Sequence, residues 1–365
     1  MNVVVDLIRK ENEHHVFNSE MVKYFDSCGE CLFFLDEKSS SISNVKETSK
    51  VKKIHVKCSQ AYFWVFSNLL LFSILIKNGR EKHYAFLSAT PLQYILLSII
   101  SKLFRVKVSI FMHGELGYLK EANGFGQSIG AKFINLAFNL TSRVNFIAIN
   151  AFIYDNLVEL YPSTKFVHIE HPIQDSPNVR LKNLRDKKNI FGAFGIQSSN
   201  KRSEKIYEIS SLLPDEFFNN NMLTTVGVSD ESFSYDLNER VEHRCRGTLK
   251  ECLIPFDEFM ANVKDIDFVL FFSENDSRYE LTPSGVFSDC IALNKPIIAI
   301  KTSMLVSYFE KYGELGYLCE NIEGMVETII NIAQEEESLK TIKLNLDGVK
   351  TKLSKDYYVE KINAL

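Results

Sequence analysis

The chain has 365 residues, enough for two domains of ordinary size that each bury a core of their own. Hydrophobic residues make up 45% and charged residues 24% of the sequence, which is typical of a folded globular protein and excludes a disordered one. The formal net charge is −4 and the cations are spread along the chain, so the bulk charge gives no indication of a nucleic-acid partner.

Strand-like and helix-like segments alternate from the N-terminus onward. Apolar, β-branched runs predict strands, and apolar residues at helical spacing predict the helices between them. The strands of the first half are expected at 2–8, 31–35, 53–56, 83–88, 106–112, 145–149 and 165–169. The helices are expected near 18–26, 61–76, 91–104, 127–142 and 151–161. Such alternation is typical of βαβ units and of a mostly parallel sheet that is covered on both faces.

The composition changes after Pro172. Residues 174–188 combine Pro, Asn and many charged side chains without apolar periodicity, which predicts a linker. A second alternating series follows, with strands expected at 189–195, 222–228, 267–272, 296–300 and 315–318. We therefore predict an α/β fold of two doubly wound Rossmann-like domains facing across a cleft, with boundaries at 1–173 and 189–340. A C-terminal helix over 341–365 could return to the first domain.

The run AYFWVFSNLLLFSILI, residues 61–76, is the most apolar part of the chain. It is short for a bilayer, which needs about 20 apolar residues. Two interpretations stay open: a helix of a core or dimer face, or a surface helix that leans on a membrane. The N-terminal MNVVVDLIRKENEHH is not a signal peptide, so we expect a cytoplasmic protein, with contact at the inner face of the membrane as an open alternative.

Seven cysteines at irregular spacings indicate a reducing compartment and no disulfide framework. Cys28 and Cys31 match the C-x-x-C pattern, which in redox folds opens a helix whose N-terminal dipole lowers the thiol pKa. Here the motif follows a predicted helix and leads into the strand at 31–35. We therefore predict a turn with a half-buried thiol and not a redox or zinc site.

In doubly wound sheets the ligand lies at the carboxyl ends of the strands, so the loops that follow strands carry the chemistry. His113, Gly114 and Glu115 come directly after the strand at 106–112. A neutral imidazole at that place could exchange hydrogen bonds with a bound sugar. The alternative interpretation is a His that caps the turn made by Gly114.

A second loop begins at Gly195, where the first strand of the second series ends. Lys201 and Arg202 are expected at the start of the following helix, near 201–212. Backbone N–H groups, the helix dipole and two cations would together form an anion site. The alternative is two ordinary solvated cations.

A third loop precedes a helix that leads into the strand at 296–300. Ser284 and Gly285 mark the start of this helix, whose free N–H groups could receive a diphosphate. Asp289 lies about one turn inside, where a carboxylate could accept hydrogen bonds from a ribose diol. The alternative is an acid that stabilises its own helix dipole by less than about 1 kcal/mol.

With these motifs the chain resembles the GT-B-fold glycosyltransferases, most closely the glycogen-synthase-like branch that uses nucleotide-diphosphate sugars. That branch shows a G-R-x4-K loop at the start of its second domain and an E-x7-E motif before a G-x-P turn. Gly195 and Lys201 keep the first spacing, with Ile196 at the Arg position. Asp289 stands at the later Glu position, and Glu280 precedes it by nine residues where the family has eight.

The resemblance implies roles for residues of both domains. The amides of Ser284, Gly285 and Val286 would hold phosphate, Thr248 would lie near the nucleobase, and His113 would contact the donor sugar. The donor-binding set implied by the resemblance is Gly195, Arg202, Thr248, Glu280, Ser284, Gly285, Val286 and Asp289. The loop after the first strand would face the acceptor through His14, His15 and Asn18.

The resemblance also implies the reaction: transfer of a sugar from a nucleotide-diphosphate sugar to a saccharide or lipid-linked saccharide acceptor. Capsule, O-antigen or exopolysaccharide synthesis is an analogy at the level of the fold. Lys201, Arg202 and backbone amides would stabilise the departing diphosphate, with no cofactor and no metal.

The resemblance favours retention, with His113 positioning the sugar and no protein base required. An inverting enzyme would instead need a carboxylate base on the first domain, for which Glu115 is the candidate. Two other functions stay open: a nucleotide-sugar epimerase of the same fold, and a non-catalytic nucleotide-sugar-binding or scaffold protein, which the missing Arg at position 196 makes plausible. No nucleic-acid partner is expected, and the donor, the acceptor and the oligomeric state are open.

Overall fold

The computed structural model describes residues 1–6, 15–37, 39–54, 60–79, 81–140, 143–174, 189–235, 238–249, 254, 256–275, 279–334 and 339–365. These residues form two compact units. The first unit contains Met1–Gln174, Ser277–Pro283 and Leu353–Leu365, and the second contains Asp175–Asp276 and Ser284–Lys352. Two later segments, Ser277–Pro283 and Leu353–Leu365, thus also belong to the first unit. Residues 175–188 of the predicted linker lie outside the described residues.

The first unit is built on a seven-stranded sheet whose neighbouring strands are all parallel. Its order is β3-β2-β1-β4-β5-β6-β7. The central strands of this sheet are almost entirely buried because helices cover both faces of the sheet. The strands are β1 (Asn2–Val5), β2 (Cys31–Asp36), β3 (Lys50–Ile54), β4 (His83–Phe86), β5 (Lys107–Met112), β6 (Val144–Ala148) and β7 (Phe166–His168).

The helices of this unit lie on the two faces of the sheet. Val3 and Val5 of β1 join a core cluster with buried side chains of α2, α3, α4 and α5. On the other face, Phe111 of β5 contacts Phe17 and Phe25 of α1 edge-on. The α-helices are α1 (His15–Ser27), α2 (Gln60–Asn78), α3 (Pro91–Phe104), α4 (Phe125–Asn139), α5 (Ala151–Leu160) and α13 (Lys355–Asn363). Short 3-10 helices are η1 (Ser40–Asn44), η2 (Gly114–Leu119) and η5 (Tyr279–Leu281).

The second unit is built on a six-stranded parallel sheet of order β10-β9-β8-β11-β12-β13. Counted within each unit, the second sheet runs 3-2-1-4-5-6, which is the doubly wound order of dinucleotide-binding folds, and the first sheet has the same order with a seventh strand added. The prediction of two Rossmann-like α/β domains is therefore confirmed. The strands are β8 (Asn189–Phe194), β9 (Asn221–Val226), β10 (Val241–Arg244), β11 (Phe268–Phe271), β12 (Ile297–Ile300) and β13 (Gly316–Cys319).

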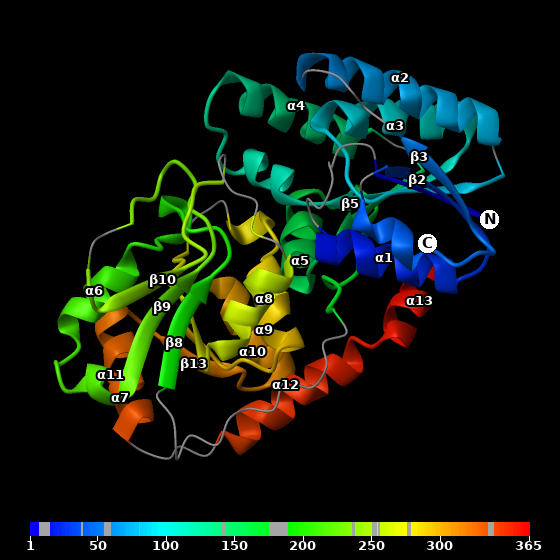
Figure 1. Ribbon diagram of the computed structural model, residues 1–365. Coiled ribbons are helices and arrows are strands. Elements are labelled where there is room, and N and C mark those ends of the chain that lie inside the picture. Colours follow the sequence, from blue (N-terminus) through cyan, green and yellow to red (C-terminus); the bar gives the residue numbers. More distant parts are fainter. Residues whose placement is uncertain are drawn as a thin grey trace. The chain divides into compact units, whose positions relative to one another are not determined.

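Within the second unit, α6 and α11 lie on one face of the sheet, and α8, α9 and α10 lie on the other (Figure 1). Buried side chains of α6 and α11 form one core cluster with Ile298 and Ile300 of β12. The helices are α6 (Lys205–Leu212), α7 (Phe217–Asn220), α8 (Phe256–Asp265), α9 (Gly285–Ala292), α10 (Ser303–Tyr312), α11 (Ile322–Gln334) and α12 (Lys340–Lys352), with the 3-10 helix η4 at Ser199–Lys201.

Two predicted helix starts are wrong. The helix expected at 201–212 begins only at Lys205. Arg202 adopts the left-handed conformation with φ 53° and ends η4, so the helical conformation is interrupted there. The helix expected near 18–26 already begins at His15. Asn18 is therefore an interior residue of α1 and does not cap it.

The C-x-x-C residues lie where the sequence predicted a turn. Cys28 follows the end of α1, and Cys31 opens β2 with its thiol donating to the carbonyl of Phe25. Burial raises the pKa of Cys31 to about 12, so its thiol stays protonated at neutral pH. Among the helices that the structure describes, none combines the length and the hydropathy that a membrane span requires.

Candidate active site at the carboxyl ends of the strands

The loop after β8 is built on close backbone contacts. Gly195 has φ 95°, and a Cβ on it would lie 3.1 Å from Val286 Cγ2 and 3.7 Å from Lys201 Nζ. Gly227, which follows β9, approaches even more closely, since its Cβ would lie 2.1 Å from the carbonyl oxygen of Gly195. Both positions need glycine. Three predicted site residues, Gly195, Lys201 and Val286, therefore lie together.

The ammonium group of Lys201 lies in this confined space. Burial lowers the pKa of Lys201 to about 8, against an opposing effect of the nearby Asp230 carboxylate. The ammonium has no hydrogen-bond or ion-pair partner among the residues that the structure describes. A desolvated cation without a partner is costly, so this geometry suits an anionic ligand.

The start of α9 lies beside the same loop through Val286. Ser284 is the N-cap, and its hydroxyl accepts a hydrogen bond from the amide of Phe287 at 3.4 Å. The amides of Gly285 and Val286 have no acceptor within the described part of the chain. Free amides at a helix start favour a negatively charged group.

Asp289 lies one turn inside α9 and is partly exposed. Burial raises the pKa of its carboxyl group to about 7. No described residue gives this carboxyl group a hydrogen bond or an ion pair. A carboxylate kept without a partner inside a fold costs stability, which is a common property of functional sites.

Arg202 is oriented by a carboxylate of its own unit. Its guanidinium Nη1 lies 2.8 Å from Glu274 Oε1, and both side chains are about 40% exposed. Glu274 follows β11, so this ion pair joins the loops after β8 and β11 at the point where the strand order reverses. Sequence reasoning missed Glu274 because an acid in a long loop has no distinguishing spacing.

Thr248 lies in a turn that continues the sheet past the end of β10. Bridges join Gln197 to Ser229 and Ser229 to Thr248, so the loops after β8, β9 and β10 lie side by side. The carbonyl of Gly247 accepts hydrogen bonds from the hydroxyls of Ser229 and Tyr235.

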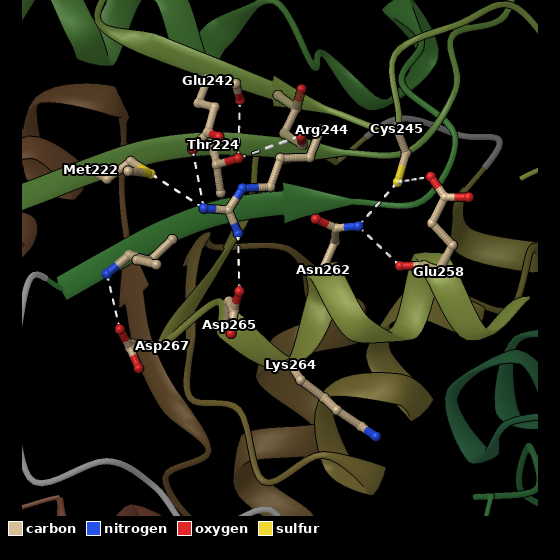
Figure 2. A network of polar contacts seen from close by, with 12 residues as sticks. Met222, Thr224, Glu242, Arg244, Cys245, Glu258, Asn262, Lys264, Asp265 and Asp267 are labelled. Atoms are coloured by element: carbon tan, nitrogen blue, oxygen red, sulfur yellow. Dashed lines mark hydrogen bonds and ion pairs between the residues drawn. The ribbon is translucent and has the colours of Figure 1, made fainter.

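Contacts of Arg244 and Cys245 with neighbouring side chains hold the turn that contains Thr248 in place (Figure 2). Arg244 on β10 lies 3.1 Å from Glu242 and 3.5 Å from Asp265 at the end of α8. Cys245 follows in the left-handed conformation with φ 57°, and Asn262 of α8 donates to its sulfur at 3.4 Å. Such a backbone conformation persists only where neighbours determine it, which fixes the path of the turn that leads to Thr248.

Glu280 belongs to the first unit, whereas Ser284 and Asp289 belong to the second. Its carboxylate lies 2.9 Å from Lys120 Nζ, and its carbonyl accepts a hydrogen bond from Asn156 at 3.2 Å. The next residue, Leu281, is fully buried in the core of the first unit. Glu280 is therefore fixed by contacts within the first unit.

His113 and Glu115 lie together at the end of β5 in the first unit. The ring nitrogen Nε2 of His113 donates to the carbonyl of Leu87 at 2.8 Å, and the ring packs against Phe17 at 4.7 Å. Glu115 Oε1 accepts two hydrogen bonds, from the His113 amide at 3.0 Å and from the Tyr94 hydroxyl at 2.6 Å. The carboxylate thereby fixes the turn that presents His113.

Asn18 contacts a buried acid that sequence reasoning missed. Its side-chain amide donates to Asp6 Oδ2 at 2.7 Å, and Ser88 donates to Asp6 Oδ1 at 2.7 Å. Asp6 and Ser88 follow β1 and β4, the strands at which the order of the first sheet reverses. Sequence reasoning missed Asp6 because it falls inside the predicted strand at 2–8, whereas β1 ends at Val5.

The other two predicted acceptor-side residues precede Asn18. His14 lies outside the described residues. His15 opens α1, but its side chain lies outside them as well.

His171 is a further side chain at this edge that the sequence did not single out. Its Nδ1 donates to the carbonyl of Pro172 at 2.9 Å, and its ring lies 5.5 Å from Phe17. Burial lowers the pKa of His171 to about 4, so the imidazole is neutral at pH 7. The hydroxyl of Tyr358 in α13 donates to the His171 carbonyl at 3.0 Å and holds this segment in place.

A separate cavity of about 440 Å³ lies at the amino ends of β9 and β10, at the edge opposite to these loops. Charged residues line it, and two of them, Arg240 and Asp215, already form an ion pair. It is therefore not the site described above. Within the described ranges, no group of three or more His, Cys, Asp and Glu side chains is arranged to hold a metal ion.

Comparison with solved structures supports the fold. The chain is similar to HepE of Anabaena, solved with UDP and glucose, with TM-score 0.67, 13% identity, and 100% and 98% of the two chains covered. It is similar to WaaG, a glycosyltransferase of lipopolysaccharide biosynthesis (TM-score 0.61, 11% identity, 100% and 98% covered). A glycosyltransferase from Rickettsia africae gives TM-score 0.59 at 12% identity, with 100% and 96% covered.

No protein-family model matches the chain, and no curated protein matches it significantly by sequence. The likeness to solved structures at these identities defines the fold. The chain has the two-domain Rossmann-like GT-B fold.

Proposed function

We propose that the protein is a glycosyltransferase that moves a sugar from a nucleotide-diphosphate sugar to a saccharide or lipid-linked saccharide acceptor. The observation that carries this proposal is the partly buried ammonium of Lys201, which has no hydrogen-bond or ion-pair partner among the described residues and lies beside Gly195 and the start of α9. The similarity to HepE, solved with UDP and glucose, and to the glycosyltransferase WaaG supports the same reaction class.

The second unit binds the donor in this proposal. Lys201 and the amides of Gly285 and Val286 meet the diphosphate, whose negative charge grows as the sugar–phosphate bond breaks. Asp289 accepts hydrogen bonds from the ribose diol, and the turn at Thr248 approaches the nucleobase. The glycogen-synthase-like branch fits this assignment through Gly195, Lys201 and Asp289.

Ligand binding in this proposal stabilises the charged form of Lys201. At its pKa of about 8 the free amine is mostly charged at pH 7, and a bound diphosphate would hold the proton more firmly. The charge is neutralised by this cation and by backbone amides, so the proposal involves no metal and no cofactor. Donor binding that persists in excess EDTA is the expected result.

The first unit binds the acceptor in this proposal, through the polar edge that contains Asp6, His113 and His171. His113 and His171 each use one ring nitrogen to donate a hydrogen bond to a backbone carbonyl. The imidazole of His171 is neutral at pH 7, so its second ring nitrogen is a hydrogen-bond acceptor. Glu115 already accepts two hydrogen bonds and is assigned a positioning role. We therefore favour retention of the sugar configuration over inversion by a Glu115 base.

The proposed setting is surface polysaccharide synthesis, such as capsule, O-antigen or exopolysaccharide, in the cytoplasm at the inner face of the membrane. The similarity to WaaG, which acts in lipopolysaccharide biosynthesis, supports this assignment.

Incubation with a panel of nucleotide sugars, with and without saccharide and lipid-linked acceptors, tests the proposal. We expect nucleotide release that rises with one acceptor and a glycosylated product of higher mass. A changed sugar without release would instead identify an epimerase, and binding without any conversion would identify a nucleotide-sugar-binding protein. Either of these outcomes overturns the proposed reaction.

A further inference from the structure

Exposed apolar side chains are concentrated on three helices of the first unit. Among the residues that the structure describes, fifteen large apolar side chains are exposed, and eight of them lie on α2, α3 and α4. We call these eight the outer patch: Leu69, Phe72 and Ile76 on α2, Ile99, Leu103 and Phe104 on α3, and Phe125 and Leu136 on α4.

The outer patch belongs to one surface of one unit. All three helices bury their inner sides in the same core cluster, through residues such as Leu71, Leu97 and Ile134. Helices α3 and α4 pack side by side, and Gln93 of α3 reaches Ser67 of α2 at 3.5 Å. The three helices lie next to one another in Figure 1. The exposed side chains therefore point away from the sheet on neighbouring helices.

The spacing within each helix shows that these are faces and not scattered residues. Leu69, Phe72 and Ile76 follow one another at three and four residues, which places them on one side of α2. Phe125 and Leu136 are eleven residues apart, about three full turns of α4. Exposed apolar side chains gathered on neighbouring helices of one unit are typical of an interaction site.

The charge of the three helices is one-sided. By sequence, α2, α3 and α4 contain no Asp or Glu, although the whole chain has 46 acids and only 42 Lys and Arg. They carry Lys77, Lys102 and Lys132, all exposed, and Arg105 follows directly at the end of α3. A net acidic protein thus has an apolar surface whose only charges within the helices are positive.

The combination of exposed apolar side chains and lysines indicates which kind of partner binds the outer patch. Two copies of the patch facing each other would bring lysines against lysines with no acid to pair them, which disfavours a self-association surface. Apolar side chains flanked by lysines suit an anionic lipid surface, where the apolar groups enter the acyl boundary and the lysines meet phosphate headgroups. We propose that the outer patch is a docking surface for an anionic phospholipid bilayer.

The inference does not depend on the proposed transfer reaction, because vesicle binding needs no nucleotide sugar. The test is co-sedimentation of the whole chain with vesicles of phosphatidylcholine alone and of phosphatidylcholine mixed with phosphatidylglycerol. We expect binding to the mixed vesicles that weakens as salt is added, and much weaker binding to the neutral ones.

Two double variants on the patch separate its apolar and its charged parts. Leu69→Ser with Leu103→Ser removes two side chains that are 64% and 70% exposed, and it should lower binding to mixed vesicles at least about tenfold. Lys77→Glu with Lys102→Glu should lower binding to mixed vesicles by about tenfold or more and leave binding to neutral vesicles unchanged.

Matched control variants lie on the second unit. Leu212→Ser with Leu344→Ser removes two other exposed leucines, and Lys340→Glu with Lys343→Glu reverses two exposed lysines of α12. Neither should change vesicle binding. Unfolding midpoints of all variants should stay close to that of the parent, since each altered side chain is exposed.

Three results would overturn the proposal. The parent chain fails to bind mixed vesicles, or the control variants lose as much binding as the patch variants. In the third, the parent is a dimer by light scattering, Leu69→Ser with Leu103→Ser turns it into a monomer, and no vesicle binding is seen. That result would assign the patch to a second copy of the chain. Nucleotide release measured on the same samples keeps a failure of this inference separate from a failure of the proposed reaction.

Discussion

Two titratable side chains of the second unit are shifted toward their neutral forms by burial. The pKa of Lys201 is lowered to about 8 and that of Asp289 is raised to about 7, and neither group has a partner among the described residues. Both shifts have desolvation as their first cause. A site that keeps charges unpaired until a ligand arrives sacrifices stability for binding.

Asp289→Asn should therefore stabilise the protein at high pH. The folded pKa lies above the unfolded value, so the folded state holds the proton more tightly, and stability falls as pH rises from about 4 to about 7. Asp289→Asn has no ionisable group at this position, so its stability does not fall in this way. We expect its unfolding midpoint to exceed that of the parent at pH 8 and to match it at pH 4, measured by thermal unfolding across a pH series. An equal midpoint at pH 8 would show that burial does not penalise the carboxylate.

The same substitution should weaken the proposed donor contact. Loss of a hydrogen bond to a charged acceptor costs about 1.5–3 kcal/mol, or about 10- to 100-fold in donor affinity at pH 8. The advantage of the parent over Asp289→Asn should shrink as pH drops below about 7, because the protonated carboxyl group is the poorer acceptor. Calorimetric titrations of both proteins at pH 6 and pH 8 measure both effects, because the titration of Lys201 affects both proteins alike and cancels in the ratio of their affinities. A variant that binds more tightly than the parent would exclude the ribose contact.

Glu115→Gln tests the positioning role of Glu115. The amide oxygen of Gln can still accept from the His113 amide and the Tyr94 hydroxyl, so we expect turnover to fall by less than about tenfold. Loss of a general base costs about 10²- to 10⁴-fold. Turnover lost to that extent with donor binding intact would identify Glu115 as a base and favour inversion.

At the scale of elements, periodicity predicted the strands and helices well because each has a uniform apolar side. The predicted strand 31–35 and the observed Cys31–Asp36 differ by one residue. The start of α6 could not be predicted, since no glycine or other local signal marks the left-handed conformation that Arg202 adopts. Short segments that depend on remote partners have no periodic signal.

The same limit applies to the candidate site. Gly195 and Lys201 could be predicted because their spacing is local, and their contact with Val286 follows from the parallel order of β8, β11 and β12. Asp6 was hidden inside a predicted strand. The ion pair of Glu280 could not be predicted, because only the packing of Leu281 in the first unit explains its place.

Helix α13 gives a test at this scale. Tyr358 is fully buried, stacks on Tyr24 at 4.5 Å and donates to the His171 carbonyl. Tyr358→Phe should cost about 1 kcal/mol through the lost hydrogen bond, and Tyr358→Ala about 3–5 kcal/mol through the lost ring. Denaturant unfolding measures both values. Leu344→Ala, at an exposed position of α12, is the control and should change stability by less than about 0.5 kcal/mol.

At the scale of the whole molecule, each of the two units has its own parallel sheet and its own polar edge where the strand order reverses. The first unit presents hydrogen-bonded side chains such as His113 and His171. The second presents the ammonium of Lys201 and the amides at the start of α9, which have no hydrogen-bond partner among the described residues. That difference suits a neutral saccharide in one unit and a nucleoside diphosphate in the other. The chain joins the units more than once, since Ser277–Pro283 and Leu353–Leu365 both return to the first unit.

The most direct test of the central claim is calorimetric titration of the whole chain with UDP, GDP and ADP at pH 7. The account predicts that one of them binds, and that Lys201→Met weakens this binding by about 10- to 100-fold, since a charge-assisted contact is lost. Lys205→Met is the matched control, because Lys205 pairs with Glu208 on the surface of α6, and it should bind like the parent. Binding of no nucleoside diphosphate, or equal affinity for the parent and Lys201→Met, would contradict the account.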